Sequence, residues 1–185
     1  MSHETTTGTE RSAVTEQLLA RIRDIPDYPE PGILFKDITP LLNDAPVLRA
    51  GVEALADPYR DQGVDHVVGL EARGFILGAP VALELGAGFV PARKAGKLPA
   101  ATIEQSYDLE YGTAAVEIHS DAIAPGSRVL IVDDVLATGG TGRAAVDLVH
   151  RAGGTVVGFS VLMELGALRG REKMPDVEPH VLLSV

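Results

Sequence analysis

The chain has 185 residues, of which 45% are hydrophobic, so it is long enough to bury a substantial core. It has no cysteine, which excludes disulfides and thiolate metal sites and fits a reducing cytoplasm. Its 16 basic and 26 acidic residues give a formal net charge of −10, which argues against nonspecific nucleic-acid binding and against a role at a membrane surface.

The first part of the chain predicts helices separated by an irregular segment. Residues 1–11 are polar and threonine-rich, so we expect a disordered tail rather than a signal peptide. An amphipathic pattern predicts a helix over about 12–23, and the proline-rich stretch 25–42 fits neither the helical nor the strand period. Asn43-Asp44 is typical of a helix cap and predicts a second helix after it.

The middle of the chain predicts strands followed by turns. Residues 64–70 predict a short strand that runs through the turn Glu71-Ala72-Arg73-Gly74 into a third helix. Residues 88–92 predict another strand, which leads into a basic turn over 93–97. The polar stretch 99–112 matches no period, and a loop of this length is often a functional lid.

The remainder alternates strands with a helix. We expect a helix over 141–152 and strands at 114–119, 129–132 and 156–162, and residues 180–185 are a candidate last strand. Alternating strands and helices predict a mostly parallel central sheet flanked by helices, within a single domain over 12–185. The apolar stretch 74–92 contains Glu84, prolines and glycines, so it does not predict a membrane-spanning helix.

The segment VLIVDDVLATGGTG, residues 129–142, is the most informative in the chain. Asp133 and Asp134 follow an apolar strand, where they can accept hydrogen bonds from two ribose hydroxyls. The glycine-rich turn that follows exposes amides at a helix start, which suits a phosphate. An ordinary capped turn remains an alternative. The two acids rule out the dinucleotide fingerprint that Gly140 and Gly142 resemble, and the chain has no triphosphatase loop.

Two further groups can bind an anion. Arg93, Lys94 and Lys97 form the only dense basic cluster, which can neutralise a diphosphate or be a solvated turn. Arg73 in the strand-end turn can do the same, or can form a surface pair with Glu71.

The 99–112 stretch and Phe35 are open to two interpretations each. Acidic and aromatic residues in a loop beside a phosphate site suggest a lid that carries an acid/base group, although solvated acids are the default. Phe35 is a rare aromatic in this chain, and it can belong to the core or stack on a flat ligand.

Together these segments resemble one family. VLIVDDVLATGGT is similar to the phosphoribosyl-diphosphate (PRPP) motif of type I phosphoribosyltransferases. Further segments resemble the adenine phosphoribosyltransferases among them: DYPEPGILFKDITPLL, GLEARGFILGAPVA, PARKAGKLP, SYDLEYGTAAVEIH and ELGALRGREKM. The resemblance implies the phosphoribosyltransferase fold, with a small hood and a flexible lid loop. It also implies purine salvage in the cytoplasm by pentosyl transfer from PRPP to adenine, giving AMP and pyrophosphate, with Mg²⁺ held mainly by PRPP and water near Asp133 and Asp134.

The resemblance also assigns roles to residues. The PRPP site would comprise the two aspartates, the turn and the pyrophosphate-binding residues: Asp133, Asp134, Ala137, Thr138, Gly139, Gly140, Thr141, Glu71, Ala72, Arg93, Lys94 and Lys97. Adenine would lie between Phe35 and Leu165, near Leu34, Lys36 and Arg73. Glu110, with Tyr107 and Tyr111 in the lid, would manage the proton at N7, so Glu110 and Arg73 are the candidate catalytic residues. A homodimer is implied, with Arg93 reaching the neighbouring site, and no nucleic acid or membrane partner.

The chain departs from the family pattern at two positions, and two other functions are alternatives to this one. Ala95 stands where relatives often carry a lysine, which weakens the expectation that every position of the basic turn binds pyrophosphate, and Lys36 stands where some have arginine. A PRPP-binding regulator of transcription would need a DNA-binding domain, for which the segment before Ser12 is too short. A transferase for orotate, hypoxanthine or xanthine is disfavoured by GILFKD and by the LEYG segment.

Overall fold

The computed structural model describes residues 6–108 and 112–185. These residues divide into two compact units, one up to Ala54 and the other from Leu55. The single domain predicted over 12–185 therefore contains two units, and the boundary falls inside one helix, α3.

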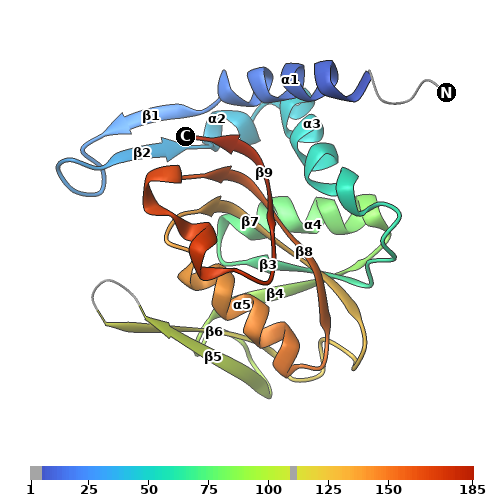
Figure 1. Cartoon of the computed structure of the whole chain (residues 1–185). Coiled ribbons are helices and arrows are strands. Elements are labelled where there is room, and N and C mark those ends of the chain that lie inside the picture. Colours follow the sequence, from blue (N-terminus) through green and yellow to red (C-terminus); the bar gives the residue numbers. More distant parts are fainter. Residues whose placement is uncertain (1–5, 109–111) are drawn as a thin grey trace. The chain divides into compact units, whose positions relative to one another are not determined.

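The first unit combines helices with a two-stranded hairpin (Figure 1). Strands β1 and β2 pair antiparallel, with Ile25 opposite Phe35. The prediction of an irregular segment over 25–42 was therefore wrong, because strands this short and separated by prolines show no readable period. The first helix begins earlier in the chain than the pattern indicated. The elements are α1 (Thr6–Leu19), β1 (Arg23–Pro26), β2 (Leu34–Asp37), α2 (Thr39–Leu42) and α3 (Ala45–Ala56).

Side-chain hydrogen bonds of two aspartates stabilise the start of α3 and the end of the hairpin. The backbone N–H of Val47 donates to Oδ1 of Asp44 at 3.4 Å, so the predicted cap of α3 is confirmed. At the end of the hairpin, Asp37 accepts from the hydroxyl (2.6 Å) and the N–H (2.9 Å) of Thr39 and from Arg23. The Thr39 hydroxyl and amide, with the Arg23 guanidinium, lower the pKa of Asp37 to about 2.

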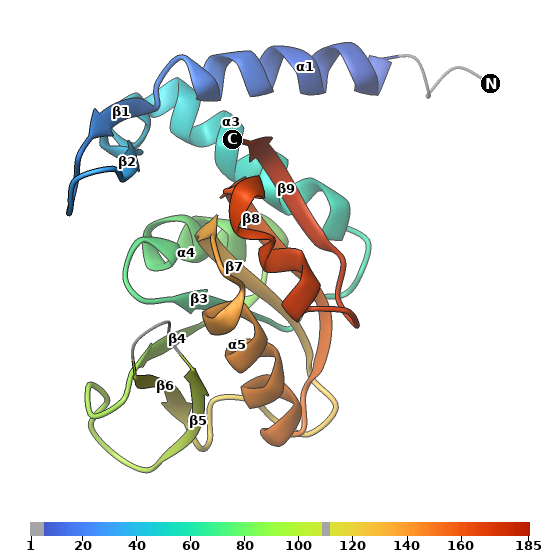
Figure 2. The same ribbon diagram turned by 60° about the vertical axis from the view of Figure 1, so that its left-hand side comes forward.

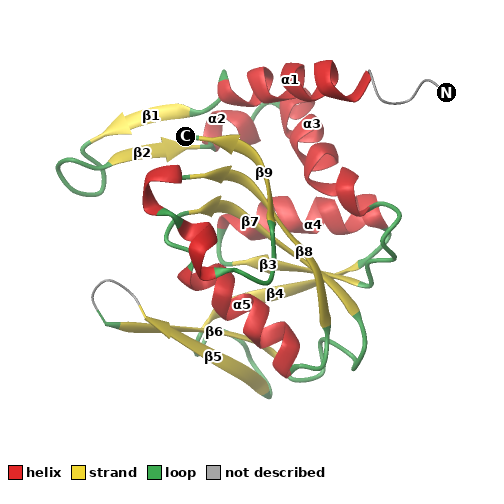
Figure 3. Cartoon of the chain, viewed as in Figure 1, coloured by secondary structure: helices red, strands yellow, loops and turns green. Residues whose placement is uncertain are grey.

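The second unit is built on a seven-stranded sheet in the order β5-β6-β4-β3-β7-β8-β9 (Figure 3). The five strands from β4 to β9 in this order are parallel, and β6 and β5 extend the sheet antiparallel. This confirms the mostly parallel sheet. Its strands are β3 (His66–Leu70), β4 (Gly88–Lys94), β5 (Thr102–Asp108), β6 (Thr113–His119), β7 (Arg128–Leu136), β8 (Thr155–Glu164) and β9 (Pro179–Ser184).

Helices α4 (Arg73–Leu85) and α5 (Gly140–Arg151) cover opposite faces of this sheet (Figure 2). The β3–α4–β4 connection moves along the sheet in one direction and β7–α5–β8 moves in the other. Since such crossovers are right-handed, the two helices must lie on opposite faces. Short 3₁₀ segments complete the unit: Asp57–Tyr59, Gly166–Leu168 and Gly170–Lys173.

Three strands of this sheet differ from the sequence-based expectation. Strand β4 continues to Lys94, so Arg93 and Lys94 of the predicted basic turn lie in a strand that pairs with β6. Half of the 99–112 stretch, expected to be a loop, forms β5, which pairs along its whole length with β6. Pairing with β6 stabilises this largely polar strand, and Ile103 and Tyr107 on its inner side pack against the core. Strand β7 does not end at Val132 but continues to Leu136, because β8 runs beside it and supplies hydrogen-bond partners as far as Glu164.

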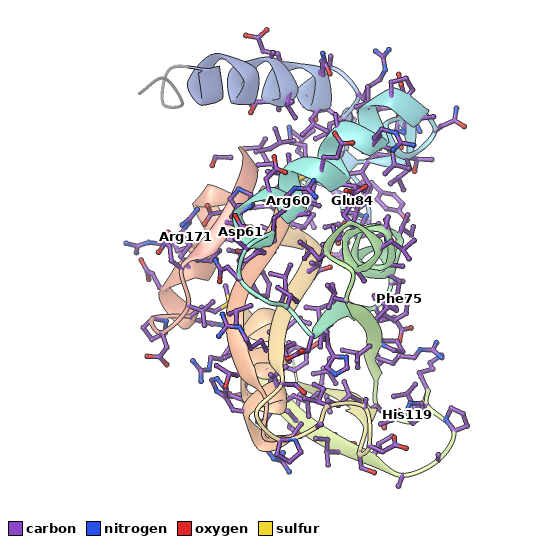
Figure 4. All side chains as sticks on the ribbon, turned by 90° about the vertical axis from the view of Figure 1, so that its right-hand side faces the viewer. Arg60, Asp61, Phe75, Glu84, His119 and Arg171 are labelled. Atoms are coloured by element: carbon purple, nitrogen blue, oxygen red, sulfur yellow. The ribbon has the colours of Figure 1, made fainter. Side chains whose placement is uncertain are left out.

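The sheet and α5 enclose the main core of this unit. Its members are apolar and almost fully buried, and they come from every central strand: Val68, Leu70, Val90, Ala92, Val116, Ile118, Val129, Ile131, Phe159 and Val161, with Ala144, Val146, Leu148 and Val149 from α5. On the outer side, Arg60 forms an ion pair with Glu84 of α4 at 3.4 Å (Figure 4). Within the described residues, no helix is long and apolar enough to cross a membrane.

Candidate functional site

The site lies where β3 and β7 run side by side. The chain leaves these neighbouring strands toward opposite faces, since α4 follows β3 and α5 follows β7. At such a switch point, the carboxyl ends of the strands flank an open crevice, which is where α/β sheets bind ligands. Glu71–Gly74 and Asp133–Asp134 both lie at this position, as the sequence predicts.

The two aspartates are held in fixed positions. The backbone N–H of Asp134 donates to Oδ1 of Asp133 at 2.8 Å. Asp133 also lies against the start of α4, where a Cβ added to Gly74 would approach its Oδ1 to 2.8 Å. Only glycine fits here, so helix α4 can begin directly beside the carboxylate.

The pKa of Asp133 is raised well above its ordinary value. Burial contributes most, and the charge of neighbouring Asp134 adds to it, while the amide of Asp134 and the charge of Arg73 oppose it. A raised pKa in a carboxylate pair at a strand end is typical of a functional site.

The partner of Asp134 is Arg73, the first residue of α4. Its Nε lies 2.6 Å from Oδ2 of Asp134, close enough for an ion pair, but without the alignment of a hydrogen bond. The Asp134 side chain is only 8% exposed, whereas that of Arg73 is 40% exposed. Oδ2 of Asp134 is buried and accepts no hydrogen bond from the described residues.

The glycine-rich turn follows β7 as predicted. Gly139 has a φ of +78° and precedes the first residue of α5, Gly140. The turn therefore presents amides at a helix N-terminus, an arrangement that binds phosphate. The ring of Tyr107 and the carbonyl of Asp108 lie beside Gly140, since a Cβ added there would be 3.3 and 3.5 Å from them. Tyr107 belongs to β5 and packs against the core.

The turn after β3 contains a cis peptide bond between Glu71 and Ala72. Glu71 accepts from the N–H of Lys94 (3.0 Å) and from Nε of Arg93 (3.3 Å). The pKa of Glu71 is lowered overall. Burial alone would raise it, but the hydrogen bonds from the Lys94 amide and the Arg93 guanidinium have the larger combined effect. Arg93 also donates to the carbonyl of Lys97 at 2.9 Å, so it links the two turns within its own chain.

Glu117 organises the basic turn, and sequence reasoning missed it. Its side chain, in β6, accepts from the N–H groups of Lys97 and Leu98, both at 2.9 Å, and the residue is 4% exposed. The Leu98 amide is the largest contribution to its lowered pKa, and it outweighs the effect of burial. A sequence signal for Glu117 was available, because an acidic residue inside the otherwise apolar strand Thr113–His119 must find hydrogen-bond partners when it is buried.

The expected adenine-binding residues belong to both units. Leu165 follows β8 in the second unit, where its N–H donates to the carbonyl of Leu136 at 2.9 Å. Leu34, Phe35 and Lys36 form β2 in the first unit. Phe35 makes an edge-to-face contact with Tyr28, with ring centroids 5.2 Å apart.

The other predicted site residues are Lys36 in the first unit and two residues of the expected lid. Lys36 pairs with Asp24 at 2.8 Å. Glu110 and Tyr111 lie outside the described residues. Over the described ranges, no three His, Cys, Asp or Glu side chains gather as a metal cluster.

Comparison with known proteins places these features in one family. The model of the phosphoribosyl transferase domain matches residues 40–180. The chain therefore belongs to the phosphoribosyltransferase family, the class that its fold and its paired aspartates define.

Within this class, the relatives are of one kind. An adenine phosphoribosyltransferase of Thermobifida fusca is 70% identical over 164 residues, which are 89% of this chain and 93% of the relative. The crystal structure of the Rhodothermus marinus enzyme superposes with a TM-score of 0.90 at 54% identity, covering 94% of this chain and 99% of that one. The structure of the Saccharomyces cerevisiae enzyme, complexed with adenine and an imino-altritol bisphosphate, superposes with a TM-score of 0.88 at 38% identity. The superposition covers 93% of this chain and 99% of the yeast chain. The chain belongs to the adenine phosphoribosyltransferases.

Proposed function

We propose that this protein is a purine-salvage enzyme that transfers the 5-phosphoribosyl group from PRPP to adenine, giving AMP and pyrophosphate. The observation that carries the proposal is the pair Asp133–Asp134 followed by the Gly139–Gly140 turn at the switch point, in a chain 70% identical to an adenine phosphoribosyltransferase. The adenine in the yeast complex supports the choice of base.

The proposed roles follow from the chemistry of each group. Asp133 and Asp134 accept from the ribose hydroxyls, and the amides of the turn 137–141 bind the 5′-phosphate. The cationic residues near Glu71 and Ala72, namely Arg93, Lys94 and Lys97, stabilise the departing pyrophosphate. Cleavage at C1′ develops oxocarbenium character, as in glycosyl transfer, so water must be kept from the site.

The base is proposed to bind between Phe35 and Leu165, with Leu34 and Lys36 nearby. Arg73 would face the N3 side of adenine, and Glu110 would manage the proton at N7. Tyr107 and Asp108 of β5 lie beside Gly140 in the glycine-rich turn. A lid role is proposed for Tyr107, together with Glu110 and Tyr111, which lie outside the described residues.

The residues present fit a magnesium ion that arrives with its substrate. Mg²⁺ usually keeps several waters and binds substrate phosphates, so we place it mainly on PRPP and water, with Asp133 and Asp134 nearby and no direct protein ligand. When bound, the ion would neutralise the charge of the diphosphate.

The functional unit is proposed to be a homodimer in the cytoplasm. Ile76 and Leu83, one above the other on α4, are 46% and 83% exposed, and such an apolar stripe favours a protein partner. Arg93 would reach the neighbouring site, which requires that it exchange its contacts with Glu71 and Lys97. A cysteine-free chain suits a reducing compartment.

An ultraviolet assay with PRPP and Mg²⁺, offering adenine, hypoxanthine, guanine and orotate in parallel, tests the function. Turnover with adenine alone is the expected result. Turnover with another base would overturn the roles of Phe35, Arg73 and Glu110. Binding of PRPP without turnover would instead indicate a regulator. Sedimentation velocity of the same protein tests the dimer.

A further inference from the structure

The segment after β8 runs back over the glycine-rich turn. A Cβ added to Gly170 would lie 2.3 Å from the carbonyl oxygen of Ala137 and 3.1 Å from the nitrogen of Gly139. A Cβ added to Gly139 would lie 2.2 Å from the carbonyl oxygen of Gly170. The two backbones are therefore in direct contact, with no room for a side chain on either glycine.

An ion pair between a buried carboxylate and a partly exposed arginine holds this segment in place, and the same arginine also pairs with Glu178. Nε of Arg171 lies 2.8 Å from each carboxylate oxygen of Glu164, whose side chain is 9% exposed. Glu164 is the last residue of β8 and pairs in register with Leu136, the last residue of β7. The ion pair thus joins the strand beside the turn to the residue directly after Gly170. Figure 4 labels Arg171 on this C-terminal part of the chain.

We propose that the Arg171–Glu164 ion pair is a positioning device for the phosphate-binding turn. It keeps Gly170 against Ala137 and Gly139, and so fixes the direction in which the amides of 137–141 point. Neither charged residue is proposed to touch the substrate. The inference rests on the proposed binding of the 5′-phosphate at this turn.

The energetics favour such a role. Amides bind an anion most strongly when they are already aimed at it, because no ordering cost is left at the moment of binding. Nε of Arg171 is shared between both oxygens of Glu164, and a hydrogen bond between two charged groups is stronger than one between neutral groups. Glu164 is largely buried, whereas Arg171 is half-exposed and also pairs with Glu178. When the Glu164 charge is removed, the guanidinium is therefore free to move toward Glu178 and solvent, and Gly170 beside it can shift.

A second ion pair in the same segment provides the control. Arg169 and Glu172 pair at 2.8 Å, but their side chains are 75% and 63% exposed. An exposed pair contributes little to stability or position. Glu164→Gln and Glu172→Gln are thus the same chemical change applied to a buried and an exposed carboxylate a few residues apart.

The test compares AMP with adenosine, which differ only in the phosphate. Dissociation constants of both ligands are measured by calorimetry for the wild type and for both variants. For Glu164→Gln, we expect the preference for AMP over adenosine to fall at least about tenfold, the equivalent of about 1.4 kcal/mol. For Glu172→Gln it stays unchanged. Arg171→Lys, which keeps the charge but cannot reach Glu164 and Glu178 with separate nitrogens, should retain part of the preference.

Each other outcome has a defined meaning. A folded Glu164→Gln protein with the full wild-type preference overturns the positioning role. If that variant does not fold, Arg171→Lys decides, and an unchanged preference overturns the proposal. If Glu164→Gln loosened the whole protein, the affinities for AMP and for adenosine would fall by the same factor. The ratio of the two affinities would then stay constant, and this result would also contradict the positioning role. If the wild type itself shows no preference for AMP, the phosphate placement fails instead.

Discussion

The guanidinium of Arg73 lies 2.6 Å from Oδ2 of Asp134, so a partly exposed cation neutralises a buried carboxylate at the switch point of the sheet. Strand β7 supplies the acid and the first residue of α4 supplies the base, which brings two neighbouring strand ends into one charge network. This oxygen is buried and accepts no hydrogen bond from the described residues, so the charge of Arg73 is what stabilises it.

Asp134→Asn should weaken PRPP binding by about 10- to 150-fold, the range expected for one hydrogen bond to a charged group. The amide removes an acceptor and also releases Arg73. Isothermal calorimetry with PRPP and Mg²⁺ measures the effect. Asp147→Asn is the matched control, because Asp147 pairs with Arg143 on α5, away from the two strand ends. Equal affinities for both variants would remove Asp134 from the ribose site.

Asp133→Asn should stabilise the ligand-free protein at neutral pH while it impairs PRPP binding. The folded-state pKa of Asp133 is raised by burial and by Asp134, so ionisation costs free energy of folding as the pH rises from the unfolded pKa through the folded one. The stabilisation by the neutral form is fully present only below the unfolded pKa. Asparagine stays neutral throughout and can still accept from the Asp134 amide.

Thermal unfolding between pH 4 and pH 8 measures this effect. A gain on the order of 1 kcal/mol would raise the Tm by about 2–4 °C for a chain of this size. The difference from the wild type should grow with pH. A variant that is less stable than the wild type at pH 8 would contradict the raised pKa.

The sequence predicted where the paired aspartates and the glycine-rich turn lie better than it predicted the strands around them. The run 129–134 identified the paired aspartates because an apolar strand that ends in acids is a local pattern. The polar strand β5 escaped prediction because it is stabilised by pairing with β6, which a local window does not contain. The contact of Gly139 with Gly170 is likewise a tertiary relation between distant segments, and no spacing rule indicates it.

Glu110→Ala should retain PRPP binding but lower kcat sharply, by about 10²- to 10⁴-fold if Glu110 is the acid/base group. Glu104→Ala is the control, because Glu104 is an exposed acid in β5 of the same hairpin. Steady-state rates with adenine and the calorimetric affinity for PRPP separate the two effects. Unchanged turnover would exclude Glu110 from the mechanism.

Asp37 should titrate far below an ordinary aspartate, with a midpoint near pH 2, because Thr39 and Arg23 stabilise its ionised form. The folded-state pKa is depressed, so its stabilisation of the hairpin end is present above the unfolded pKa and is lost as the pH falls toward 2. Carboxyl-carbon NMR of the labelled protein measures the midpoint. In Thr39→Val the midpoint should rise, since the hydroxyl donor is the largest cause of the shift. A midpoint near 4 in the wild type would contradict the hydrogen-bond network.

Phe35→Ala should raise the KM for adenine about tenfold or more and leave the affinity for PRPP unchanged, because a stacking ring serves the base alone. Tyr28 contacts the Phe35 ring edge-to-face and restricts its orientation, so Tyr28→Ala should give a smaller increase in the same direction. Tyr28→Phe keeps the contact without the hydroxyl and serves as the matched control, with a KM close to that of the wild type. If Phe35→Ala changed the KM values for adenine and PRPP equally, Phe35 would act through the hairpin fold rather than by stacking. An adenine KM that does not change at all would mean that another side chain provides the stacking face.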